Sequence, residues 1–213
     1  MTLLSCVLLL QFGTTIALAQ APQHSEPSRV GEQPEEVVRR LYHEVVARHP
    51  LGIPNGEDRK HITPYLSKRL ISRLDTASAC EKDYFRLHPD PHSKPQIDWL
   101  EFGLFSGAWE EALPAAFHLE RTQRGKDGSF SVYLRLAYKE TWATYGRAPN
   151  PEGTFRWHIA VVVVPENGHF VVDDVIYLKD EVDPQEVNPP LSQTLAIGCD
   201  GSRWVGYSEE DAR

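Results

Sequence analysis

Residues 155–178 constrain the fold of this chain more than any other stretch, because they read as one long β-hairpin. Asn167-Gly168 predicts a type I′ turn, in which both central residues need a positive φ. Side chains alternate between the two faces of a strand, so a regular hairpin places Val161 opposite Asp174. One face then carries Trp157, Ile159, Val161, Val163, Val172, Asp174 and Ile176.

Asp174 is the one charged residue on this apolar face. A carboxylate in apolar surroundings is costly unless it is paired or hydrogen-bonded. Two interpretations stay open. Asp174 is a structural anchor satisfied by nearby donors, or it is a catalytic acid or base whose pKa burial has raised.

The order of the remaining elements predicts an α+β fold. Helical spacing of apolar residues begins at Pro34, and a second helix is expected from Thr63-Pro64, with Thr63 as its N-cap. The period then changes to two, which predicts strands near 116–124, 129–142, 154–165 and 169–179. Helices followed by antiparallel strands indicate N-terminal helices packed on a curved antiparallel sheet.

The N-terminus reads as a signal peptide over residues 1–19, with cleavage after Ala19 in the sequence Ala17-Leu18-Ala19. No Lys or Arg precedes the apolar run, and the alternative is an uncleaved membrane anchor. A polar linker is expected over 20–33, a single domain over 34–198 and a tail over 199–213. We therefore expect a periplasmic or secreted protein.

Two cysteines, Cys80 and Cys199, remain after cleavage at this site. In an oxidising compartment two cysteines usually form one disulfide, and the alternative is a pair of buried free thiols. No spacing typical of a zinc or thiol-redox site occurs.

The formal net charge of −8 argues against nucleic acid or an anionic membrane as partner. Basic residues do not cluster along the sequence. Arg121, Arg124 and Lys126, for example, are balanced by Glu120 and Asp127. This pattern predicts a solvated surface.

Several short segments together resemble a known family. They are Val37–Tyr42, Pro64–Ser67, Asp83–Phe85, His169–Tyr177 and Leu191-Ser192. Over residues 34–198 the chain resembles a bacterial family of unknown function in the nuclear transport factor 2-like superfamily, the cystatin-like α+β cone. Such members are secreted proteins or lipoproteins, and some relatives are periplasmic immunity proteins that bind a toxic amidase. Phe170 stands where the family commonly has Trp.

The resemblance implies a pocket between sheet and helices, and related cones use a pocket carboxylate as a general base. Asp174 would be that carboxylate, with Tyr42, Tyr65 and Tyr138 as pocket neighbours. We expect a non-catalytic binding module for a protein partner or a small apolar ligand, without a cofactor. The alternatives are a small-molecule isomerase or dehydratase that uses Asp174, and a structural envelope protein.

Two further groups of polar residues are candidate sites. His88, Asp90 and His92 have a metal-like H-x-D-x-H spacing in a proline-rich segment, which also fits a plain loop. His158 is expected opposite Tyr177 with Asp173 beside them, which forms a surface cluster if that hairpin face meets solvent.

Overall fold

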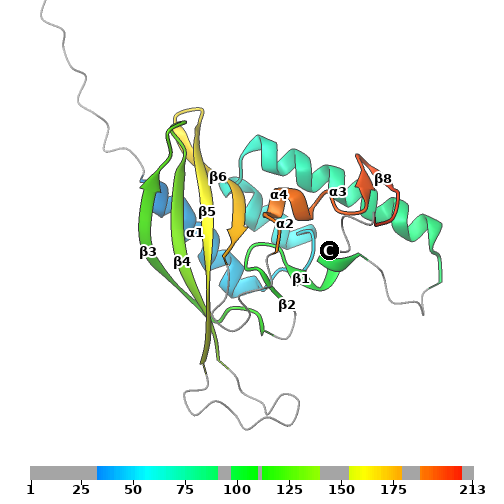
Figure 1. The fold of residues 1–213 in the computed structure, drawn as a ribbon, viewed down its shortest axis with the longest axis horizontal. Helices are drawn as coiled ribbons and strands as arrows, with labels where there is room; N and C mark the ends of the chain where they lie inside the picture. The colour runs from blue at the N-terminus through cyan, green and yellow to red at the C-terminus, as the bar shows by residue number, and fades with distance from the viewer. Residues whose placement is uncertain (1–32, 91–96, 110–111, 140–153, 179–187, 208–213) are drawn as a thin grey trace, which may run out of the picture. The chain divides into compact units, whose positions relative to one another are not determined.

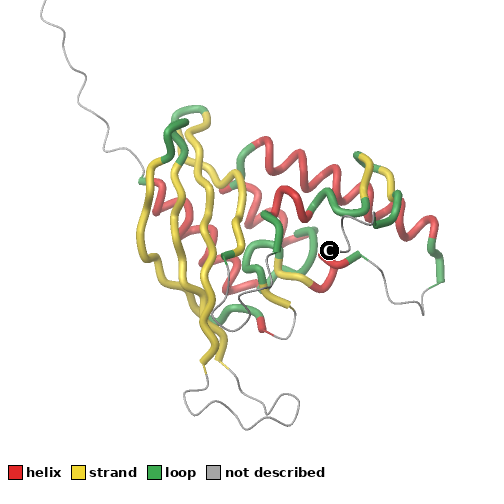
Figure 2. Tube along the Cα trace, viewed as in Figure 1, coloured by secondary structure: helices red, strands yellow, loops and turns green. Residues whose placement is uncertain are grey.

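The structure is a computed structural model that describes residues 33–90, 97–109, 112–139, 154–178 and 188–207. It is a mixed α+β fold whose main sheet has four antiparallel strands in the order β3-β4-β5-β6. Helix α1 lies against one face of this sheet, as Figures 1 and 2 show. The elements in chain order are α1 (Pro34–Arg48), α2 (Gly56–Ile62), η1 (Thr63–Tyr65), α3 (Lys68–Leu87), η2 (Asp98–Glu101), β1 (Phe102–Gly103), β2 (Ala108–Trp109), β3 (Ala116–Arg124), β4 (Phe130–Lys139), β5 (Thr154–Glu166), β6 (His169–Tyr177), α4 (Leu191–Thr194), β7 (Cys199–Asp200) and β8 (Arg203–Trp204).

Helix α1 and strand β4 supply much of the core, as their apolar periods predict. Pro34 occupies the first turn of α1, where its missing N–H costs nothing. The core side of α1 and the facing side of β4 are fully or almost fully buried. These residues are Val37, Val38, Leu41, Tyr42, Val45, Val132, Leu134 and Leu136. Among the described helices, none is both long and apolar enough to cross a membrane.

The second predicted helix begins later than expected. Thr63 opens a 3-10 turn, and the N-cap of α3 is Ser67, whose Oγ accepts a hydrogen bond from the Leu70 amide at 3.0 Å. The cause is a tertiary contact. The Ser67 amide donates to the Val172 carbonyl at 2.8 Å, which holds this part of the chain extended beside the edge strand β6. Helix α2 before it was not predicted.

The hairpin of β5 and β6 has the predicted turn but not the predicted register beyond it. Val163 pairs with Val172 as expected, yet the next pair is Val162 with Asp174. Asp173 is thus the extra residue of a β-bulge, which shifts every later residue of β6 by one. Val175 and Tyr177 are therefore buried, while Asp174 and Ile176 are only partly buried.

The bulge corrects two predictions. Asp174 does not share the apolar face of Val161, because Val161 pairs with Val175. His158 does not pair with Tyr177, because Tyr177 pairs with Ile159 and turns into the core. The buried carboxylate of this hairpin is Asp173, which is 2% exposed.

The turn at Asn167-Gly168 has positive φ at both residues, 52° and 81°, as a type I′ turn requires. Asn167→Val is expected to lower the free energy of unfolding by about 1–2 kcal/mol, because a β-branched residue resists the left-handed conformation. Urea denaturation measures this loss. Asn167→Gly is the control, since glycine adopts positive φ freely. An unchanged midpoint for Asn167→Val would show that the turn does not hold the hairpin.

The predicted disulfide is present. Cys80 on α3 is bonded to Cys199 on β7, with 6.1 Å between their Cα atoms. Strands β7 and β8 form a short hairpin that packs on α3, where the ring of Trp204 meets that of Tyr84 edge-on at 5.0 Å. The segment predicted as a tail from residue 199 thus begins with this packed hairpin. The disulfide fits an extracellular or periplasmic protein.

Candidate functional site

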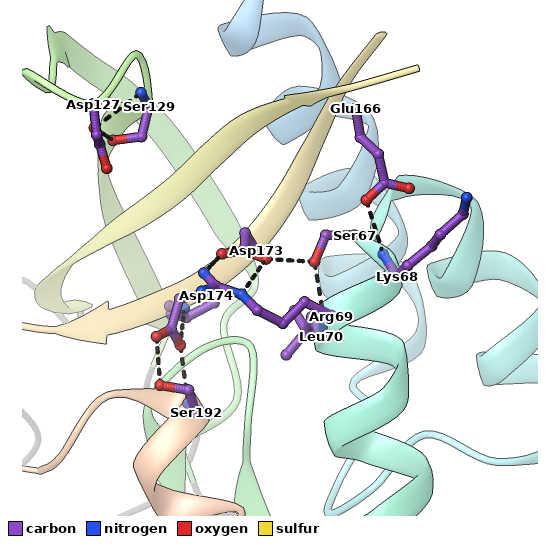
Figure 3. Close-up of polar contacts among 11 residues, drawn as sticks. Ser67, Lys68, Arg69, Leu70, Asp127, Ser129, Glu166, Asp173, Asp174 and Ser192 are labelled. Carbon is purple, nitrogen blue, oxygen red and sulfur yellow. Dashed lines mark hydrogen bonds and ion pairs between the residues drawn. The ribbon is translucent and has the colours of Figure 1, made fainter. Parts of the chain in front are cut away.

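Asp173 anchors the edge strand β6 to the beginning of α3, as the close-up in Figure 3 shows. Its Oδ1 accepts hydrogen bonds from Ser67 Oγ at 2.6 Å and from Arg69 Nε at 3.0 Å. Its Oδ2 forms an ion pair with Arg69 Nη2. Because Ser67 is also the N-cap of α3, the buried carboxylate of Asp173 links strand β6 to the first turn of α3 and to the exposed side chain of Arg69.

Asp174, the predicted catalytic residue, points the other way and holds α4 (Figure 3). Its Oδ1 accepts from the Ser192 amide at 2.9 Å, and its Oδ2 accepts from Ser192 Oγ at 2.6 Å. The Val175 amide donates to Oδ1 as well, at 2.9 Å. Both oxygens are therefore engaged by protein donors. This geometry is that of a structural anchor, because three of the about four lone-pair sites of the carboxylate accept hydrogen bonds from the protein.

Within the described residues, none of the tyrosines predicted to line a pocket with Asp174 is hydrogen-bonded to it. Tyr42 is fully buried, and its hydroxyl donates to the Phe105 carbonyl at 2.7 Å. Tyr65 and Tyr138 are half-buried, and within the described residues no hydrogen bond joins either of them to Asp174. Tyr177 is a tyrosine whose pKa the charge of Asp174 raises, and the sequence pattern placed it on the wrong face.

Tyr42 and Tyr177 are both held as neutral hydrogen-bond donors. The Tyr177 hydroxyl donates to the Leu104 carbonyl at 2.6 Å. Burial raises the pKa of Tyr42 well above its usual value, and the neighbouring Tyr177 raises it further. Burial also raises the pKa of Tyr177, with a further contribution from the negative charge of Asp174. These two tyrosines fasten Leu104 and Phe105 to the core.

The metal-like spacing at His88 does not form a site among the residues that the structure describes. The His88 ring stacks on Tyr84 at 4.4 Å, and its Nδ1 lies 3.0 Å from the Tyr84 carbonyl. His92 lies outside the described residues. Within the described ranges, no group of three His, Cys, Asp or Glu side chains is placed to hold a metal ion.

A group of basic residues gathers on the face of the sheet opposite α1, where sequence reasoning expected no cluster. Arg135 pairs with His118 on one side and with His158 on the other. Arg156 shares this face because its partner, Ala137, is two residues from Arg135. Strands adjacent in the sheet thus collect charges that lie more than ten residues apart in the chain.

The basic side chains on this face are partly exposed, and each of those described below has a near neighbour. The side chains of Arg135 and His158 are 43% and 39% exposed, and each lies near Glu120 Oε1, at 3.8 and 3.6 Å. The Arg121 guanidinium lies 4.0 Å from the ring centroid of Tyr133, its partner across the strands. We call Arg121, Arg135 and Arg156 the arginine face. The period-two alternation of β4 and β5 was the sequence signal that could have revealed it.

Comparison with known proteins adds no family to these observations. A scan against models of protein families gives no match, and a search of curated proteins finds none with significant sequence similarity. The site is therefore interpreted from its own residues.

Proposed function

We propose that this chain is a secreted or periplasmic binding module without catalytic activity, and that its arginine face docks an acidic surface of a partner protein. The observation that carries the proposal is the gathering of Arg121, Arg135 and Arg156 on one exposed sheet face of a chain with a formal net charge of −8. Arginines on an exposed surface attract a partner surface of opposite sign and speed its association. Glu120, beside Arg135, offsets part of this positive charge.

The hydrogen bonding of Asp173 and Asp174 favours a binding function over a catalytic one. Asp174 is occupied by Ser192, and Asp173 is occupied by Ser67 and Arg69. An isomerase or dehydratase needs a carboxylate that can take a proton from a substrate. The order of helices and strands is compatible with the resemblance to the nuclear transport factor 2-like cones, and some relatives in that resemblance are periplasmic immunity proteins that bind a toxic amidase.

A protein partner also fits the surface better than a small apolar ligand. Tyr133 and its neighbour Arg121 offer an aromatic ring and a guanidinium on the same strand pair. Tyrosine and arginine are enriched at the energetically important positions of protein interfaces. Every second side chain of β3, β4 and β5 points to this face. Together they form a broad surface and not an enclosed site.

The test is a charge reversal with a matched control. We expect Arg135→Glu/Arg156→Glu to weaken salt-dependent binding to poly-L-glutamate by at least about tenfold, equivalent to about 1.4 kcal/mol. The control, Arg39→Glu/Arg40→Glu, makes the same change of charge on α1, where both side chains are 50% exposed. Binding is measured by titration calorimetry at two salt concentrations, and melting temperatures check that both variants fold.

The same pair of variants is then used for affinity capture from native envelope extract, read by mass spectrometry. A partner of the arginine face is an acidic protein captured by the wild type and the α1 control but lost with the sheet variant. Equal capture by both variants would contradict the proposal, and so would a turnover of small carbonyl substrates that depends on Asp174.

A further inference from the structure

A groove of about 310 Å³ lies between α3 and the α4–β7 segment, away from the arginine face. This size is near the lower end for small-molecule sites in proteins. In Figure 1, α4 lies between β6 and α3. Its lining residues are Ser72, Arg73, Thr76, Ser192, Leu195, Ala196, Cys199 and Gly201.

Arg73 is the charged residue of this lining, and it is half-buried. Among the described residues it forms no hydrogen bond or ion pair. Eight other arginines of the described chain pair with carboxylates. They are Arg39, Arg40, Arg48, Arg59, Arg69, Arg86, Arg135 and Arg203. A partly desolvated guanidinium without a partner is unfavourable, and an oxyanion that enters the groove would compensate it.

The hydroxyl groups in the groove differ in whether they can donate a hydrogen bond to a ligand or only accept one. Ser192 Oγ donates its proton to Asp174 Oδ2 at 2.6 Å, and Thr76 Oγ1 donates to the Ser72 carbonyl at 2.9 Å. Both oxygens therefore present only lone pairs to a ligand. The Ser72 hydroxyl has no partner among the described residues, so it can donate. The groove thus offers donors at Ser72 and Arg73 and acceptors at Thr76 and Ser192.

A disulfide and two hydrogen bonds tie the walls of the groove to the rest of the fold. The Cys80–Cys199 disulfide ties β7 to α3, and the two Ser192 hydrogen bonds to Asp174 tie α4 to β6. Leu195 and Ala196 add an apolar part to the lining. Pre-formed walls lower the entropy cost of binding.

From these features we propose that the groove binds a small organic acid that also carries a hydrogen-bond donor, such as an amino acid. Its carboxylate would lie at the Arg73 guanidinium, where the planar fork of donors matches two carboxylate oxygens. Its ammonium or hydroxyl group would donate to Thr76 or Ser192. The apolar body would lie on Leu195. This site is independent of the proposed docking of a protein on the sheet.

The test uses three probes against the mature protein, namely L-alanine, propionate and inorganic phosphate. We expect L-alanine to produce saturable amide shifts in α3 and α4 in NMR titrations, and propionate to bind at least tenfold more weakly. Arg73→Ala is expected to weaken L-alanine binding at least tenfold. Lys82→Ala removes one positive charge from an exposed position of the same helix outside the groove, and it should leave binding unchanged.

A second variant separates binding from folding. Ala196 is exposed at the groove wall and carries no side-chain hydrogen bond, so Ala196→Trp should fill the groove without lowering the melting temperature. We expect it to abolish the shifts. The proposal is overturned if none of the probes gives saturable shifts, if phosphate alone binds, or if Arg73→Ala binds L-alanine as the wild type does.

Discussion

Replacing both Cys80 and Cys199 by alanine is expected to lower the free energy of unfolding by about 4–5 kcal/mol, the largest single effect in this protein. The bond joins residues 119 positions apart, so its loss gives the unfolded chain the freedom of a long open loop. Domains of ordinary stability unfold with only about 5–15 kcal/mol, and the variant should be marginal at room temperature. Urea denaturation followed by tryptophan fluorescence measures the change.

Reduction of the wild type is the control for this experiment. Cys80 is fully buried, so alanine also removes packing around its sulfur, whereas the reduced wild type keeps the side chains and loses only the bond. The two losses should agree within about 1 kcal/mol, the usual cost of a small buried deletion. A reduced protein as stable as the oxidised one would show that the bond does not restrict the unfolded chain.

The second large effect is expected at Asp173. Asp173→Ala should cost about 2–4 kcal/mol, because it removes the acceptor of the buried Ser67 hydroxyl and of the Arg69 guanidinium. The Arg69 side chain is 62% exposed, so water replaces most of its ion pair and the hydrogen bond of Ser67 accounts for the larger share. Denaturation in urea at neutral pH measures the loss.

Asp174→Ala is the matched comparison, since it removes the same chemical group one residue along the strand. We expect a smaller loss, about 1–2 kcal/mol, because Asp174 is only partly buried and holds a four-residue helix. A double-mutant cycle of Asp173→Ala with Ser67→Ala should give a coupling of about 1 kcal/mol or more. A larger loss at Asp174 than at Asp173 would mean that β6 pairs without the bulge.

The helix α1 and the strand β4 could be predicted from the sequence because the period of their apolar residues is a local property. The stripe of α1 and the alternation of β4 follow from the geometry of a single helix or strand. The type I′ turn follows from Asn167-Gly168, whose residues tolerate positive φ. The pairing of Cys80 with Cys199 followed from simple counting, since only two cysteines come after the predicted cleavage site.

The face of Asp174 was predicted wrongly because nothing local marks a bulge. Asp173 leaves the ladder to meet Ser67 and Arg69, which lie about a hundred residues earlier in the chain. A strand at the edge of a sheet has unpaired backbone groups, and the Ser67 amide meets one of them at Val172. The same contact delays the start of α3 from Thr63 to Ser67.

Local periodicity in this sequence therefore determined the main helices and the four long strands, together with the core sides of α1 and β4. The tertiary structure decided where the two carboxylates point and which basic residues share a face. Arg121, Arg135 and Arg156 come together only through the register of three strands. The groove around Arg73 exists only because α4 and β7 pack on α3. Both depend on contacts between distant segments, whose choice rests on many weak interactions that no short pattern encodes.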